Sequence, residues 1–187
     1  MPFFLLPATA GVFLPTGKNM KISDKCIKWL KNKENKVQDK TGRHIIYDDS
    51  TGRPVNPYAP LPSGATIGYG HLIRRGEDYA QGLTEQQAID LLAADVSIAE
   101  RAVQDNITVN LTQNQYDALV ALVYNIGVGA FKHSTVLKYI NNPEFHSIIY
   151  PDLESAWRAW NRTQGKVSNG LVRRRHCEWN MFSRGIY

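Results

Sequence analysis

The chain has 187 residues, 43% of them apolar and 21% charged, a composition typical of a soluble globular protein. This length suits one domain, or one domain with two lobes, and can bury a hydrophobic core without help from metals or disulfides. The formal net charge of +5 favours a polyanionic partner, either nucleic acid, an acidic membrane surface or an anionic cell wall, and charge alone does not choose among them.

Residues 1–20 are expected to form an apolar N-terminal extension. Its first fifteen residues, MPFFLLPATAGVFLP, carry no charge and contain three prolines. The run is too short to span a bilayer, and it lacks the basic segment that precedes the apolar part of a secretory signal. We therefore expect these residues to pack on the domain or to make a peripheral contact with a membrane surface. No transmembrane helix is predicted in the rest of the chain.

The first predicted helix runs from about residue 24 to residue 35. Ser23 can cap it, and an apolar face at helical spacing is formed by Cys26, Ile27, Trp29 and Leu30. From residue 36 onward, glycine and proline punctuate short β-prone runs such as 44–47. This pattern predicts a small irregular β-sheet, with a long loop between Gly52 and Gly64.

After residue 83 the pattern becomes helical. Thr84 with Gln87, and Thr112 with Gln115, have the spacing of capping boxes. They predict helices over about 84–104 and 112–124, and the second is apolar on nearly all sides, as expected for the buried centre of a lobe. The sequence thus predicts an α+β, mainly helical fold in one domain spanning 21–187, with a β lobe at about 36–80 and a helical lobe at about 83–187. Further helices are predicted at 134–141, 152–160 and 170–182.

The two cysteines, Cys26 and Cys177, are not spaced as a metal-binding or redox pair, and no Cys/His cluster has zinc spacing. They lie near opposite ends of the chain, so the pattern is compatible with a disulfide between the terminal helices or with two buried free thiols. No metal and no cofactor is predicted. The sequence also contains no helix-turn-helix, zinc-finger or RNA-binding aromatic motif, so nucleic acid is not an expected partner.

Two carboxyl groups stand where the predicted elements change. Glu34 lies near the end of the first helix, and Asp49 follows a predicted strand. If they face each other across a cleft, they provide the two unequal acids that glycoside hydrolysis requires. One carboxyl, kept protonated by partial burial, donates a proton to the leaving oxygen, and the other stays ionised. Spacing alone does not single out this pair, because a glutamate near a helix end is usually a solvated surface residue.

Five motifs occur in a fixed order along the chain. They are the helix end IKWLKNKE (27–34), the turn YDDSTG (47–52), the segment TIGYGH (66–71), the long run from LT (111–112) through YNIGVGAF (124–131) to ST (134–135), and GLVRRR (170–175) followed by Glu178 and Trp179. Together they resemble the phage-type lysozymes of glycoside hydrolase family 24, the phage endolysins, over about residues 22–182.

The resemblance implies a lysozyme-like two-lobed fold and assigns roles by position. Glu34 would protonate the glycosidic oxygen, Asp49 would hold or activate the attacking water, and the hydroxyl of Thr66 would help to place that water. Related enzymes are thought to invert configuration, which implies carboxyl groups roughly 6.5–9.5 Å apart. The resemblance also implies three substrate-binding residues, of which the first two could equally be plain core residues: Leu72 and Tyr124, lining the cleft, and Ser134, contacting sugar.

The chain departs from the family pattern in its β lobe. Asp49 follows Glu34 by fifteen positions and Thr66 follows Asp49 by seventeen, and both intervals are longer than usual. We interpret the difference as two insertions, at about 36–44 and 53–63, which loops tolerate at small entropic cost. Asp48 is the rival to Asp49 for the second carboxylate, and Asp39 is a weaker third option.

The remaining titratable residues of the motifs have structural interpretations. His71 is expected to pair with Asp95 on the following helix rather than to act as a catalytic base. The run Arg173–Arg175 predicts either a basic patch for anionic wall polymer or, for at least one of its members, an arginine of the helical lobe that bonds helix ends and carboxylates.

The function implied by the resemblance is that of a muramidase, which hydrolyses the β-1,4 bond between N-acetylmuramic acid and N-acetylglucosamine in peptidoglycan. Two alternatives remain: a lytic transglycosylase acting on the same polymer, and a non-catalytic cell-wall-binding module. The expected protein is a monomer, made in the cytoplasm of a bacterial host, that acts in the periplasm on glycan strands and lyses the cell.

Overall fold

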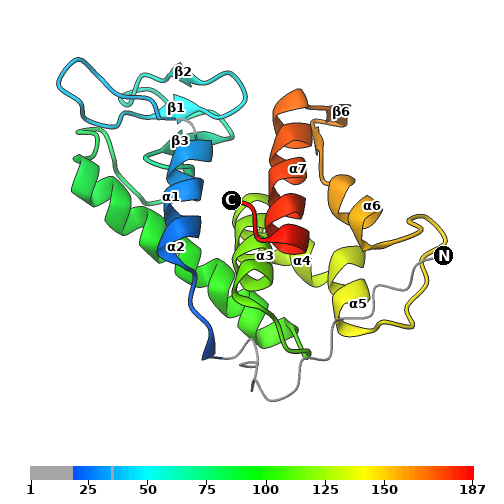
Figure 1. The fold of residues 1–187 in the computed structure, drawn as a ribbon. Helices are drawn as coiled ribbons and strands as arrows, with labels where there is room; N and C mark the ends of the chain where they lie inside the picture. The colour runs from blue at the N-terminus through cyan, green and yellow to red at the C-terminus, as the bar shows by residue number, and fades with distance from the viewer. Residues whose placement is uncertain (1–18, 35) are drawn as a thin grey trace.

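The computed structural model describes residues 19–34 and 36–187, and it confirms the α+β, mainly helical fold class. The predicted apolar extension lies almost wholly outside the described residues. Figure 1 shows a small β lobe at one end of the first two helices and a larger helical lobe beside it. The helices are α1 (Asp24–Lys33), α2 (Glu85–Asn106), α3 (Gln113–Ile126), α4 (Val128–Lys132), α5 (Thr135–Asn141), α6 (Leu153–Arg158) and α7 (Asn169–Arg184).

Local capping chemistry explains where the long helices begin. The hydroxyl of Ser23 accepts a hydrogen bond from the backbone N–H of Cys26 at 3.2 Å and starts α1. Thr84 and Gln87 form the predicted capping box of α2, and Thr112 and Gln115 form that of α3. The short helix α4 was not predicted, because the glycine turn was expected to end the helical run. Gly127 ends α3 at a φ of 85° and the chain then re-enters helical geometry.

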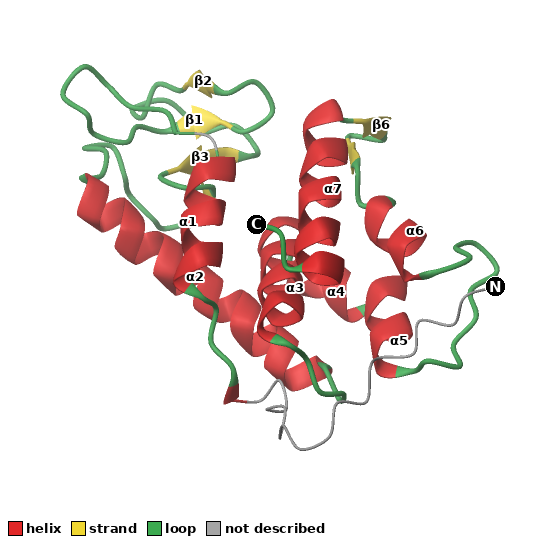
Figure 2. Ribbon diagram, in the orientation of Figure 1, coloured by secondary structure: helices red, strands yellow, loops and turns green. Residues whose placement is uncertain are grey.

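The β lobe contains a four-stranded antiparallel sheet in the order β2-β1-β3-β4 (Figure 2). Its strands are very short: β1 (Tyr47–Asp48), β2 (Arg53–Pro54), β3 (Ala65–Ile67) and β4 (His71–Leu72). In the register, Thr66 faces Tyr47 on one side and Leu72 on the other. Of the run 44–47, predicted as a strand, only Tyr47 belongs to β1. His44 instead forms isolated bridges to Gln38 and Leu83, so the prediction is wrong for most of the run.

A second hairpin, β5 (Arg162–Thr163) with β6 (Lys166–Val167), connects α6 to α7 and was not predicted. Three of its four strand residues are polar and all four are exposed, and each strand is only two residues long, too short to show the alternation that marks a half-buried strand. Gln164 at the turn has a φ of 48° and Gly165 a φ of 76°, so both residues adopt the left-handed geometry of a tight hairpin turn.

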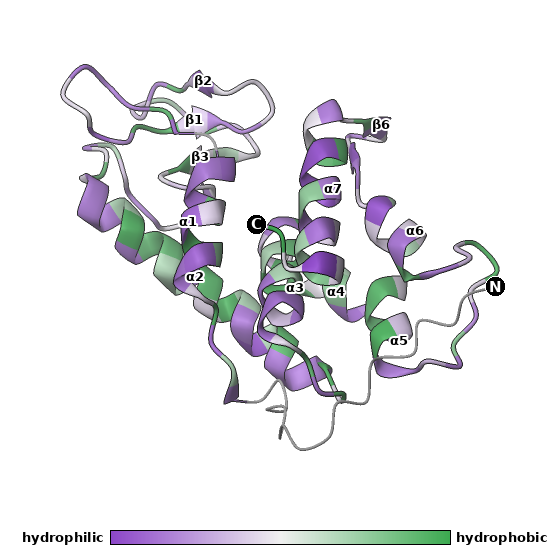
Figure 3. Cartoon of the chain, viewed as in Figure 1, coloured by the Kyte–Doolittle hydropathy of each residue, from purple (hydrophilic) through white to green (hydrophobic). Residues whose placement is uncertain are grey.

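The core of the helical lobe is built around α3, as its apolar sequence predicted. Every residue from Tyr116 to Val123 is buried, and α2 and α7 pack on this helix. The other helices mix apolar and polar residues along their length, as Figure 3 shows by hydropathy, because each buries one face only. No described helix combines the length and the apolarity needed to cross a bilayer. Both cysteines are free thiols, Cys26 buried and Cys177 partly exposed.

Candidate active site

A cleft of about 1580 Å³ separates the β lobe from α6, the β5–β6 hairpin and the N-terminal half of α7. These elements lie on opposite sides of the molecule's upper half in Figure 1. The end of α1 and the end of α3 also contribute lining residues. Glu34 and Asp49, the two carboxyl groups predicted to face each other, both line this cleft, as does the rival Asp48.

Glu34 is the residue at which α1 ends. Its backbone N–H donates to the carbonyl of Leu30 at 3.0 Å, and its own backbone is extended. The side chain is only 13% exposed, and its Oε1 accepts a hydrogen bond from Nη1 of Arg174 at 2.5 Å. The pKa of Glu34 is raised: burial is the largest cause, the Arg174 guanidinium opposes it, and the nearby Asp49 and Glu178 add to the increase. The carboxyl therefore holds a proton to higher pH than a solvated glutamate does.

Arg174 is itself held in place by a buried network on α7. Its Nε donates to Oε1 of Glu178 at 3.1 Å, and Arg175 donates to the same oxygen at 2.8 Å. Glu178 is fully buried and also accepts a hydrogen bond from the indole of Trp157 at 3.2 Å. Arg174 and Arg175 are buried whereas Arg173 is exposed, so the prediction that at least one arginine of this run bonds carboxylates within the helical lobe is confirmed for two of them.

Asp49 lies in the turn between β1 and β2. Its backbone N–H donates to the carbonyl of Gly64 at 3.2 Å, and the hydroxyl of Thr66 donates to that same carbonyl at 3.0 Å. One carbonyl oxygen thus ties Asp49 to Thr66. Partial burial raises the pKa of Asp49, with Arg174 lowering it and Asp48 raising it to a smaller extent.

The two rival aspartates are engaged elsewhere. Oδ1 of Asp48 accepts hydrogen bonds from the backbone N–H of Ser50 at 2.8 Å and from its hydroxyl at 2.6 Å. These bonds lower the pKa of Asp48. Oδ1 of Asp39 accepts equivalent bonds from Thr41, and Asp39 is not among the residues that line the cleft. Of the three aspartates, Asp49 is the one in the cleft whose carboxylate is not tied into its own turn.

The structure brings only some of the other predicted site residues near Glu34. Thr66 is 3% exposed and lies one strand from the turn that carries Asp49. Tyr124 is partly buried beside Glu34, and its hydroxyl donates to the carbonyl of Tyr69 at 2.5 Å. Leu72 is 56% exposed on the edge strand β4. Ser134 is buried away from the lining residues, where its hydroxyl caps α5 by accepting from Leu137 at 3.0 Å.

The predicted pairing of His71 with Asp95 is confirmed. Nδ1 of His71 lies 2.7 Å from Oδ2 of Asp95, and Nε2 lies 3.0 Å from Oε2 of Glu77, a second partner that was not predicted. The bond to Asp95 is the main reason that the pKa of His71 is raised, with Glu77 adding to it. Both ring nitrogens are therefore engaged in linking β4 to α2 and to the loop before it.

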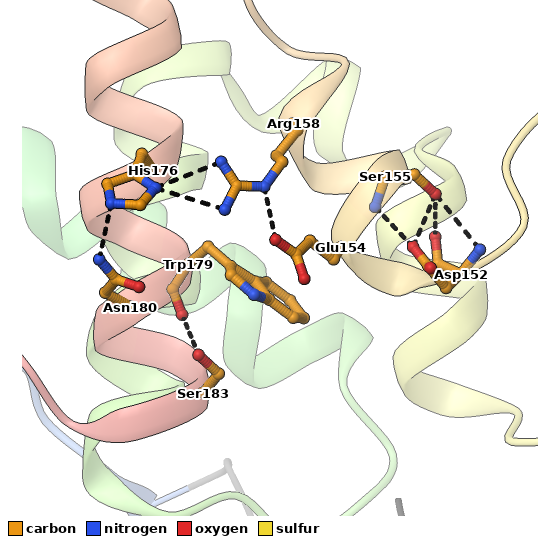
Figure 4. Close-up of polar contacts among 8 residues, drawn as sticks. All are labelled: Asp152, Glu154, Ser155, Arg158, His176, Trp179, Asn180 and Ser183. Carbon is orange, nitrogen blue, oxygen red and sulfur yellow. Dashed lines mark hydrogen bonds and ion pairs between the residues drawn. The ribbon is translucent and has the colours of Figure 1, made fainter. Parts of the chain in front are cut away.

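The helical side of the cleft is basic. Arg158 of α6 and His176 of α7 face each other in Figure 4, and the Arg158 guanidinium lies 3.4 Å from Nδ1 of His176. Nε of Arg158 also bonds Glu154 on its own helix at 2.6 Å. Arg162 and Arg173 also line this side of the cleft, and neither forms an ion pair with an acidic group of the described residues. Acidic groups thus line the β-lobe side of the cleft and cationic groups the helical side.

No group of three or more His, Cys, Asp or Glu side chains within 19–34 and 36–187 is arranged to hold a metal ion.

Residues 47–178, more than half of the chain, match the family described as phage lysozyme. The chain belongs to the phage lysozyme family. The match includes Asp49, Thr66 and the α7 arginines, and it begins after Glu34.

Two relatives are similar to this chain over most of its length. The endolysin of Salmonella phage P22 is 34% identical over 166 residues, covering 87% of this chain and 98% of its own. The endolysin from Escherichia coli O157:H7 phage FAHEc1 has a similar structure, with a TM-score of 0.68, 32% identity, and coverage of 90% of this chain and 97% of its own.

A third relative is larger. The endolysin of Bacillus phage B103 is 42% identical over 138 residues, which make up 72% of this chain and 49% of that protein. The chain thus spans about half the length of this relative.

Sequence reasoning missed three contributors to the site of this phage lysozyme family member. Arg174 was recognised within its motif but not as the partner of Glu34, which is 140 positions away. Glu178 was noted without a role, although its spacing of four from Arg174 is that of a helical ion pair. The third contributor is Gly70, whose φ is +94° and whose ideal β-carbon would lie 2.8 Å from Oε2 of Glu34. In the sequence, the repeated glycines of TIGYGH were the signal that could have indicated this close approach.

Proposed function

We propose that this protein is a muramidase that hydrolyses the β-1,4 bond between N-acetylmuramic acid and N-acetylglucosamine in peptidoglycan. The observation that carries the proposal is the environment of Glu34, a buried carboxyl with a raised pKa in a cleft that also contains Asp49. Two carboxyl groups in unequal environments are what glycoside hydrolysis requires. The endolysin names of the relatives described above support the same substrate.

In the proposed mechanism, Glu34 enters the reaction protonated and donates its proton to the oxygen of the glycosidic bond. Asp49 is ionised and takes the proton of a water that attacks the sugar from the opposite face. The hydroxyl of Thr66 helps to place this water, and the Gly64 carbonyl, which accepts from both that hydroxyl and the backbone N–H of Asp49, holds the two residues together. Inversion of the anomeric configuration follows if water attacks directly, and retention follows if Asp49 forms a covalent intermediate.

The charge of the cleft supports a polyanionic glycan as the substrate. Peptidoglycan carries peptides with free carboxylates, and Arg158, Arg162 and Arg173 line the wall that the strand would pass. Leu72 and Tyr124 remain our candidates for contacts at the β-lobe side and the floor, and Ser134 remains a more distant one. We further propose that the protein acts on the cell wall in the periplasm as a monomer, after synthesis in the cytoplasm.

The two alternatives differ in what they require of the carboxyl groups. A lytic transglycosylase needs one acid/base residue and no aspartate to activate water, so it would work without Asp49. A wall-binding module needs neither carboxyl. Asp49 lines the cleft, its pKa is raised, and its carboxylate stays outside the hydrogen bonds of its own turn, which favours the hydrolase, because hydrolysis requires a second carboxyl group in the cleft.

The decisive experiment measures loss of turbidity of permeabilised Gram-negative cells by the wild type and by Glu34→Gln, Asp49→Asn and Asp48→Asn. We expect the first two variants to lose at least about 100-fold in rate and Asp48→Asn to retain most of it. Mass spectrometry of the fragments should find reducing ends. Anhydro ends with an active Asp49→Asn would establish the transglycosylase, and binding without any released fragment would establish the wall-binding module.

A further inference from the structure

Glu85, outside the cleft, gathers side chains from four separate segments of the chain. It is the first residue of α2 and directly follows the Thr84 cap. Its carboxylate is contacted by Lys31 of α1 at 3.3 Å, by Lys36 at 3.2 Å, by Nε2 of the fully buried His44 at 2.9 Å, and by the hydroxyl of Tyr69.

Two of these partners flank Glu34 in the sequence. Lys31 stands three positions before Glu34 and Lys36 two positions after it, and both ammonium groups converge on the one carboxylate. The ammonium of Lys31 also lies over the ring of Tyr69, 5.1 Å from its centroid. Glu85 thus fastens the chain on both sides of the residue that we propose as the general acid.

A third partner reaches Glu34 from the β lobe. Tyr69 directly precedes Gly70, the residue whose backbone is packed against the Glu34 carboxyl. The carbonyl of Tyr69 also accepts a hydrogen bond from the hydroxyl of Tyr124, and that hydroxyl, like the Glu34 carboxyl, lies next to Gly70. By holding the Tyr69 hydroxyl, Glu85 fixes the wall against which the Glu34 side chain rests.

We propose that Glu85 is a positioning residue for Glu34: its carboxylate clasps Lys31, Lys36 and Tyr69, and this clasp holds the Glu34 carboxyl in its buried position against Gly70. The inference rests on the catalytic role proposed for Glu34 above. Glu85 does not line the cleft, so it acts without touching substrate.

The ion pairs of Glu85 fit a positioning role better than a role in stabilising the folded protein. Glu85 is 43% exposed, Lys31 28% and Lys36 43%, so each ion pair is screened and adds little to stability. Several donors sharing one acceptor at a helix N-terminus still restrict its geometry. The same donors lower the pKa of Glu85 to about 2, so the clasp is ionised throughout any working pH range.

In this proposal, the pKa of Glu34 depends on whether Glu85 keeps its bonds to Lys31, Lys36 and Tyr69. Apart from the clasp, the charged or titratable groups around that carboxyl are Arg174 and Glu178 on α7, Asp49 in the β1–β2 turn, Tyr124 on α3 and Tyr47 on β1. If the clasp opens and water reaches Glu34, the desolvation that raises its pKa diminishes. The alkaline limb of the activity profile, which follows loss of the Glu34 proton, then moves to lower pH.

The test compares Glu85→Ala with Thr84→Ala, both at the start of α2. The control removes the cap hydrogen bond but leaves every clasp partner in place. We expect Glu85→Ala to lower kcat about ten-fold, with KM little changed and the alkaline limb at lower pH. Thr84→Ala should lose as much thermal stability and keep the wild-type profile. Identical profiles for the two variants would overturn the inference.

A second variant separates the clasp from simple charge effects and leaves the start of α2 unaltered. In Lys31→Gln with Lys36→Gln, loss of two positive charges alone would raise the pKa of Glu34, whereas an open clasp lowers it. We expect the lower value, measured by carbon-13 NMR of the Glu34 carboxyl, and a higher one contradicts the proposal. Inactivity of the wild type, or full activity of Glu34→Gln, would instead count against the proposed function itself.

Discussion

The backbone of Gly70 lies directly against the carboxyl group of Glu34, because a β-carbon at residue 70 would come within 2.8 Å of Oε2. Only glycine allows that approach, and only glycine adopts the φ of +94° without strain. The contact keeps water from one side of the carboxyl, so it contributes to the burial that raises the pKa of Glu34.

Gly70→Ala is therefore expected to abolish lysis of permeabilised cells while the protein remains folded. Gly76→Ala is the matched control: its φ of +93° imposes the same backbone strain, but its β-carbon would meet no heavy atom of the described residues within 4 Å. Each variant should lose about 1–3 kcal/mol of stability in urea unfolding. Equal activity in the two variants would show that the contact with Glu34 has no catalytic consequence.

Glu34→Gln should stabilise the protein at neutral pH although it removes activity. The pKa of Glu34 is higher in the folded than in the unfolded protein, so ionisation costs stability as the pH rises above about 4.3, the usual pKa of a glutamate. A neutral glutamine avoids that cost. The gain in free energy of unfolding, measured at pH 7, should shrink to nothing below pH ~4, where both states of the wild type are protonated. A gain independent of pH would contradict this account.

Asp95→Asn is expected to lower the pKa of His71 and to weaken the fold most strongly at low pH. The pKa of His71 is raised in the folded protein, so its stabilisation is fully present below about 6.5 and is lost as the pH rises through the folded value. We expect a loss of about 2–3 kcal/mol at pH 5 and a smaller one at pH 9. Asp90→Asn, on the same helix and bonded only to Gln86 among the described residues, should show no such pH dependence.

Replacing Arg162 and Arg173 by alanine should raise KM for peptidoglycan and leave kcat nearly unchanged. Both arginines line the cleft on the helical side, where they would attract the carboxylates of the wall peptides. The increase is expected to be about five-fold at low salt and to vanish near 0.5 M salt, because exposed charges are screened there. Lys25→Ala with Lys28→Ala removes the same charge from the exposed face of α1 and should have no effect.

The sequence by itself determined the features that depend on neighbours along the chain. The Ser23 cap, the two capping boxes and the apolar run of α3 all appear in the structure where their spacing predicted them. Helix starts can be read in this way because a capping hydrogen bond joins residues only three positions apart. The ordered motifs likewise identified Glu34 and Asp49 as the pair to find in one cleft, and the structure places both there.

Only the tertiary structure decided what surrounds that pair. Arg174 reaches Glu34 across 140 positions, Gly70 closes on the same carboxyl from the β lobe, and Glu85 gathers its partners from four segments. Whether a carboxyl is buried, and which charge neutralises it, depends on how the lobes pack, and no fixed spacing in the chain encodes that packing. The pKa of Glu34, on which the proposed chemistry depends, is therefore a property of the assembled cleft.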